Sequence, residues 1–62
     1  MQSYELRCKA IQETNIVTFE TEVNSFLRGK MSNIMNVEVH VSNLSEGLLY
    51  TAIITYREAI GE

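Results

Sequence analysis

Two side chains in the sequence have the chemistry of a nucleophile and a base: the thiol of Cys8 and the imidazole of His40. A thiolate beside an imidazole can carry out acyl transfer. However, the sequence has no aspartate to orient the histidine, no nucleophile elbow and no glycine-rich phosphate loop. Strand alternation around the two residues also predicts that they lie on opposite faces of a sheet. We therefore expect a protein that is not an enzyme, with Cys8 as a small core residue.

Other side chains that could form a site are weaker candidates. Glu20 and Glu22 diverge by roughly 200° around a helix, so they cannot act as a carboxylate pair. Tyr50 and Tyr56 could stack on a flat ligand, but at strand spacing such residues are more often core aromatics. A single cysteine and a single histidine cannot assemble a Cys/His metal set or an internal disulfide. We expect no catalytic, metal or cofactor residues.

Composition excludes several classes of protein. The chain has 62 residues, with 8 acidic against 5 basic residues and a net charge of -3, and it lacks the basic stripe that nucleic-acid binding requires. No apolar run approaches the roughly 20 residues that span a bilayer, and the N-terminus lacks the apolar core of a signal peptide, which favours the cytoplasm. A single domain of this length buries only about 60% of its unfolded surface. Such a small domain needs additional stabilisation, and self-association is the source that this composition leaves.

Four elements are expected within this one domain, residues 1 to 62. Alternation predicts strands over about residues 3 to 11, 34 to 42 and 48 to 57. Asn15 is suited to cap a helix over about residues 15 to 29, with Gly29 as its end. The apolar residues of that helix form one stripe: Ile16, Phe19, Val23, Phe26 and Leu27. The polar segment that ends at Gly47 predicts a hairpin, and the tail from Glu58 onward is expected to fray.

This order predicts an α+β fold of the βαββ type. The third strand lies between the other two in a three-stranded antiparallel sheet of order 1-3-2, with the helix on one face. The set expected to face the helix comprises Tyr4, Leu6, Cys8, Ala10, Val37, Val39, Val41, Tyr50, Ala52, Ile54 and Tyr56. The opposite face then carries Leu49, Thr51, Ile53 and Thr55, between a rim of Glu5, Arg7 and Lys9 and a rim of Asn36, Glu38 and His40.

An apolar centre with a polar rim is typical of an interface. The candidate interface residues are Leu49, Thr51, Ile53, Thr55, His40 and Glu38. The alternative is an ordinary surface with two exposed aliphatic side chains. Because the core is small, we favour a homodimer.

The segments "FETEVNSFLRGK", "NVEVHVSN" and "LLYTAIITYRE" resemble the small Cse sporulation-protein family of Bacillus-type bacteria and their phages. The resemblance covers residues 4 to 58, and it carries no catalytic residues over. The entry to the helix, "TNIVT", departs from the acidic segment usual in that family. By size and type the chain is also similar to small phage anti-defence proteins such as the Hachiman anti-defence inhibitor, which self-associates.

These resemblances imply a non-enzymatic, homo-oligomeric phage-type protein that inhibits a larger host protein in a bacterial defence system. Two alternatives stay open. One is an oligomer that binds or sequesters a small ligand, either like the dodecins, which share the order of elements, or as a nucleotide sponge. The chain has no tryptophan to sandwich a flavin as dodecins do. The other is a structural sporulation protein.

Overall fold

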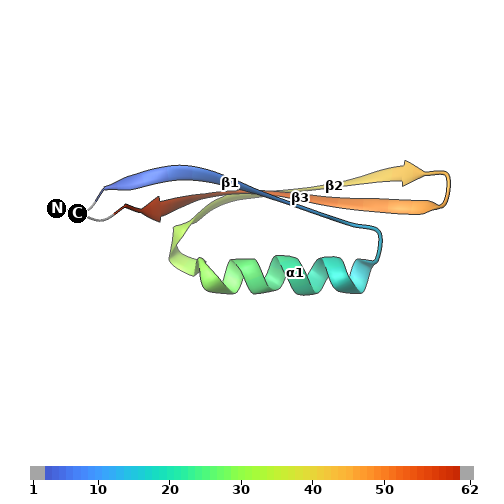
Figure 1. Ribbon diagram of the computed structural model, residues 1–62, viewed down its shortest axis with the longest axis horizontal. Coiled ribbons are helices and arrows are strands. Elements are labelled where there is room, and N and C mark those ends of the chain that lie inside the picture. Colours follow the sequence, from blue (N-terminus) through green and yellow to red (C-terminus); the bar gives the residue numbers. More distant parts are fainter. Residues whose placement is uncertain (1–2, 61–62) are drawn as a thin grey trace.

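The protein has the predicted βαββ fold in a computed structural model that describes residues 3–60 (Figure 1). The elements are β1 (Tyr4–Glu13), α1 (Ile16–Gly29), a short 3-10 turn η1 (Met31–Asn33), β2 (Ile34–Leu44) and β3 (Gly47–Ala59). All three strands pair antiparallel in the order β1-β3-β2, as expected. The molecule is elongated, with extents of 50 × 16 × 14 Å.

The start of α1 is fixed by Asn15. Its side-chain Oδ1 accepts a hydrogen bond of 3.0 Å from the backbone N–H of Thr18, and its backbone is extended. This is the N-cap that the sequence predicts, because the first N–H groups of a helix have no partner within the helix. At the other end, the backbone N–H of Lys30 bonds to the carbonyl of Leu27. The helix therefore ends at Gly29, as predicted.

The hairpin between β2 and β3 is tighter than expected, and both strands are longer. Leu44 pairs with Gly47, so only Ser45 and Glu46 form the turn. Gly47 has a φ of +140°, which a residue with a side chain rarely adopts. At the far end, Glu58 and Ala59 belong to β3 and pair with β1. The backbone N–H of Ile60 also donates to the carbonyl of Ser3 at 3.0 Å. The expectation that the tail frays from Glu58 is therefore wrong for residues 58–60, and residues 61–62 lie outside the described part of the chain.

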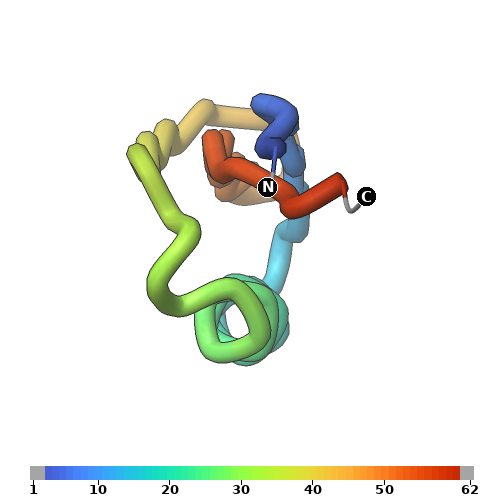
Figure 2. Tube along the Cα trace, turned by 90° about the vertical axis from the view of Figure 1, so that its left-hand side faces the viewer, coloured from blue at the N-terminus to red at the C-terminus, as the bar shows by residue number. Residues whose placement is uncertain are grey.

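The core is small and lies between α1, β1 and β3. Its buried side chains are Ile11, Phe19, Val23, Ala52, Ile54 and Tyr56. Two ring contacts extend it: Phe19 packs against Tyr50 with centroids 5.6 Å apart, and Phe26 meets the edge of Tyr56 at 5.1 Å. Figure 2, viewed along the long axis, shows α1 on one side of the strands only.

The helix covers only part of the sheet. Its 14 residues span roughly 21 Å, whereas the 13 residues of β3 extend roughly 43 Å. Figure 1 shows the β2–β3 hairpin projecting beyond the start of α1. Much of the sheet therefore has no helix beneath it.

The predicted orientation of β1 is wrong. Buried Ala52 and Ile54 are paired with Ile11 and Lys9, so the odd-numbered residues of β1 face the helix. The residues predicted to do so lie on the opposite face: Tyr4, Leu6, Cys8 and Ala10.

The physical reason is that full burial of one large side chain stabilises the fold more than partial coverage of several others. Ile11 is only 7% exposed and belongs to the core cluster that contains Phe19 and Val23 of α1. The long side chain of Lys9 is tolerated on the same face because its stem can lie along apolar surface, and its ammonium lies 5.9 Å from the Phe26 ring centroid. A shift of one residue would exchange the two faces of the strand.

Candidate functional site: the uncovered face of the sheet

The six predicted interface residues lie on one face of the sheet, the face opposite α1. Glu38 pairs with Ile53 and His40 pairs with Thr51 across β2 and β3, and directly paired residues share a face. Leu49, Thr51, Ile53 and Thr55 are half-buried along the centre, while Glu38 and His40 are exposed at the β2 margin. We call this surface the open face.

The β1 side of the open face is more apolar than predicted. Cys8 pairs with Thr55 and Ala10 with Ile53, so both lie beside the central residues, and Leu6 continues the row with an exposure of 67%. The charged rim expected here, Glu5, Arg7 and Lys9, lies on the helix side instead. The open face is therefore an apolar band over β1 and β3 with a polar margin along β2.

Because of this orientation, two predictions about Cys8 are wrong. The residue is exposed rather than part of the core, and it shares a face with His40 rather than lying opposite to it. The two are nevertheless far apart. Cys8 is level with Thr55 and His40 with Thr51, which corresponds to roughly 13 Å along the strands and two strand spacings across them. Their side chains do not form a nucleophile–base pair.

The polar groups on the open face make short-range contacts of modest strength. Nε2 of His40 lies 3.5 Å from Oε1 of Glu38, and Nε2 of Gln12 donates to Oγ1 of Thr51 at 3.3 Å. Towards the end of β3, the guanidinium of Arg57 lies 4.5 Å from the ring centroid of Tyr4. Such exposed contacts contribute about 1 kcal/mol or less each, so they orient side chains more than they stabilise the fold.

A second uncovered surface lies on the helix side of β2. Val37, Val39 and Val41 face the same way as the core residues of β3, yet they are 38–56% exposed. We call these three residues the valine row. The sequence predicted their direction correctly, but it did not show that α1, which packs on β1 and β3, leaves them uncovered.

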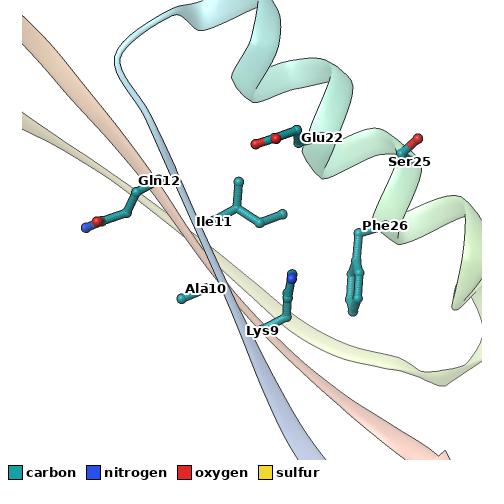
Figure 3. Close-up of a pocket in the computed structure, with 7 residues that line it drawn as sticks. All are labelled: Lys9, Ala10, Ile11, Gln12, Glu22, Ser25 and Phe26. Carbon is teal, nitrogen blue, oxygen red and sulfur yellow. The ribbon is translucent and has the colours of Figure 1, made fainter.

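An open groove of about 560 Å³ lies between β1 and α1 (Figure 3). Lys9, Ile11 and Phe26 point into the space between the two elements, and Glu22 and Ser25 border it from the helix. The tyrosines proposed to line a ligand site are elsewhere: Tyr56 is buried in the core, and Tyr50 is half-buried against Phe19.

The carboxyl groups of Glu13 and Glu22 form a pair that the sequence did not predict. A hydrogen bond to the Glu22 side chain, followed by loss of solvation and by repulsion from the Glu22 charge, raises the pKa of Glu13. Glu13 ends β1 and Glu22 is on α1, so nothing in their spacing of nine residues predicts that they meet. Both are surface groups, and their proximity is a source of pH-dependent repulsion rather than a sign of catalysis.

Within residues 3–60, no three His, Cys, Asp or Glu side chains gather as a metal ion would require. No helix in the same range has the length and apolar content needed to cross a membrane. The chain matches no family model, no curated protein and no solved structure. The resemblance to the Cse family and to anti-defence inhibitors therefore stays a prediction.

Proposed function

We propose that this chain is a non-enzymatic, homo-oligomeric protein that acts in the cytoplasm by binding a larger protein through its open face. The observation that carries the proposal is the apolar band of Leu6, Cys8, Ala10, Leu49 and Ile53 on a face that no described element covers. Contiguous exposed apolar surface, bordered by polar residues, is characteristic of protein-binding sites.

The small core supports the oligomeric part of the proposal. Only six side chains among residues 3–60 are buried. Of these, Ile54 is the one large side chain that is fully buried. A domain of this size rarely gains more than about 3–5 kcal/mol from its own core. Association with a second copy would bury more apolar surface, and each Å² of it would contribute about 25 cal/mol of stability.

The identity of the larger partner is inferred from the resemblance to small phage inhibitors. On this hypothesis the partner is a component of a bacterial anti-phage defence system. Expression of the chain in cells that carry individual defence systems should restore plaque formation in at least one of them. Absence of rescue in every system would overturn the inhibitor hypothesis.

A matched pair of variants separates the open face from the rest of the surface. Ile53→Glu places a charge in the centre of the apolar band and should abolish rescue. Val17→Glu places the same charge on α1 at a residue that is 66% exposed and should leave rescue intact. Circular dichroism of both variants checks that they are folded. If Ile53→Glu folds and still rescues plaques, the open face is not the binding surface.

A small-ligand sponge is the second candidate, and the groove between β1 and α1 is the observation that favours it. Its volume of about 560 Å³ lies within the range typical of ligand sites, and Lys9 and Phe26 together offer a cation and an aromatic ring. Native mass spectrometry of the purified protein should then show a bound small molecule that is lost in Lys9→Ala. A spectrum with only the bare protein would count against this candidate.

A further inference from the structure

The outer edge of β2 is open to pairing. β2 forms one margin of the sheet, so no strand among residues 3–60 pairs with its outer side. It is 11 residues long and contains no lysine, arginine or proline. Proteins that stay monomeric usually protect such an edge with these residues, with bulges or by keeping it short. β2 has one irregularity, at Met35, and is regular from Asn36 onward.

The centre of this strand is self-complementary. Residues 36 to 42 read "NVEVHVS", which is an amide, a valine, an acid, a valine, an imidazole, a valine and a hydroxyl. When a strand pairs antiparallel with its own copy about a two-fold axis, the residue on the axis faces itself. Each neighbour then faces the residue at the same distance on the other side. The chemical pattern is symmetric about Val39.

We propose that a second copy of this chain binds along the edge of β2, with Val39 facing the partner's Val39. In this register Glu38 faces the partner's His40, and Val37 faces the partner's Val41. The axis also falls at the midpoint of β2, because Ile34 and Leu44 are equally distant from it. This inference rests on the proposed function, whose self-association it makes specific.

Other registers and the other edge are less favourable. An axis at Glu38 would place two carboxylates opposite each other, and an axis at His40 would place Val37 opposite the partner's Asn43. For β1, the two registers that pair nearly its full length place Arg7 opposite the partner's Lys9, or Lys9 opposite itself. Like charges directly opposite each other destabilise a strand pair.

The pairing has a consequence for the open face. A two-fold axis that relates neighbouring antiparallel strands stands perpendicular to the sheet, so both helices lie on one side and both open faces on the other. The result is a six-stranded sheet with the order β1-β3-β2-β2-β3-β1. The two valine rows meet on the helix side, and the apolar bands on the opposite side become two copies of one binding surface in a single dimer.

Cysteine cross-linking tests the register directly. In a Cys8→Ser background, which removes the exposed native thiol, Val39→Cys should give a disulfide-linked dimer under mild oxidation. Directly opposed residues have Cα atoms about 4.5–5.5 Å apart, which is within the range for a disulfide.

The two flanking valines provide matched controls. Val37→Cys and Val41→Cys should each fail to cross-link alone, since each introduced thiol lies at least roughly 13 Å from its own copy. A mixture of these two variants should cross-link, because Val37 faces the partner's Val41. Non-reducing gels and intact mass spectrometry read out the result.

Charge exchange gives a second test that needs no oxidation. His40→Glu places a carboxylate opposite the partner's Glu38, and it should raise the dimer dissociation constant by about tenfold or more. Adding Glu38→Lys to His40→Glu restores opposite charges in reversed order and should return most of the lost affinity. Analytical ultracentrifugation over a range of protein concentrations measures both effects.

The outcomes separate the two proposals. A dimer by solution mass that cross-links through Val39→Cys but not through Val37→Cys or Val41→Cys alone supports the β2 register. A dimer without that pattern overturns the register and leaves self-association in place. A protein that is monomeric at every accessible concentration overturns both.

Discussion

Ile11 and Val39 flank the same residue, Ala52, from its two neighbouring strands, and both face the helix side of the sheet. Ile11 is 7% exposed and Val39 is 54% exposed. Neither residue type nor strand alternation explains this difference. A helix with its side chains is about 10–12 Å wide and strands lie about 4.8 Å apart, so one helix covers about two strands. In this protein those strands are β1 and β3.

The comparison shows that the two edge strands have different roles. β1 contributes one buried side chain, Ile11, to the core, and its other side chains on the helix side are charged. β2 places a continuous row of valines on that side and buries none of them. The apolar residues of β2 therefore contribute little to the stability of one copy and are available to a second.

Truncation of the two flanking residues to alanine tests the comparison directly. Ile11→Ala should lower the free energy of unfolding by about 2–4 kcal/mol, because it leaves a cavity in the core. Val39→Ala should lower it by less than about 1 kcal/mol in the monomer, because more than half of the residue is already exposed to water. Urea unfolding followed by circular dichroism, at protein concentrations below dimer formation, measures both. Equal losses would contradict the distinction between the strands.

Charged substitutions at the same two positions sharpen the comparison. Ile11→Lys should prevent folding, since its charge is buried without a partner. Val39→Lys should keep the circular dichroism spectrum of the folded protein and weaken self-association by about tenfold or more, because lysine protects an edge strand. Sedimentation equilibrium measures the second effect. An unweakened dimer in Val39→Lys would place the self-association surface elsewhere.

A smaller effect is expected where α1 begins. Asn15→Ala should destabilise the protein by about 1 kcal/mol, because the N–H of Thr18 loses its acceptor. Asn15→Asp supplies another acceptor and is the control. Thermal unfolding of the two variants should differ, and equal destabilisation would show that the side-chain acceptor at residue 15 does not stabilise the helix.

The smallest effect concerns Glu13 and Glu22. Since the pKa of Glu13 is raised above its ordinary value of 4.5, the folded protein binds this proton more tightly than the unfolded chain. This group therefore stabilises the fold as the pH falls through the interval just above 4.5 and destabilises it as the pH rises through that interval.

Glu22→Gln removes the repulsion between the two carboxylates and should raise the melting temperature slightly at pH 7. At about pH 4, where carboxyl groups become protonated, the gain should be smaller. Glu20→Gln, on the same helix, is the control and should show no such pH dependence. A gain from Glu22→Gln that is the same at both pH values would contradict this account.

Much of the fold could be read from local patterns. The cap at Asn15, the end at Gly29 and the alternation of β2 each depend on neighbouring residues, and all three are confirmed. The strand order 1-3-2 follows from a helix that returns the chain and a hairpin that reverses it. The positions of the six candidate interface residues on one face followed from the alternation of β2 and β3.

The orientation of β1 could not be read in the same way. Its sequence offers apolar residues in both alternations, Leu6 and Cys8 in one and Ile11 in the other. Counting favours the first, but Ile11 is the residue of β1 that joins the core cluster with Phe19 and Val23 of α1. The contact between Glu13 and Glu22 is equally non-local, because it depends on the angle at which α1 crosses β1.

The sequence by itself therefore determined the elements, their order and the direction in which each strand runs, because these depend on interactions between residues close along the chain. Tertiary structure alone decided which apolar residues are covered. That choice depends on the limited length and width of α1, and it leaves the valine row and the apolar band of the open face uncovered. Both surfaces follow from one physical fact: a single helix of 14 residues is too small to cover a sheet of this length.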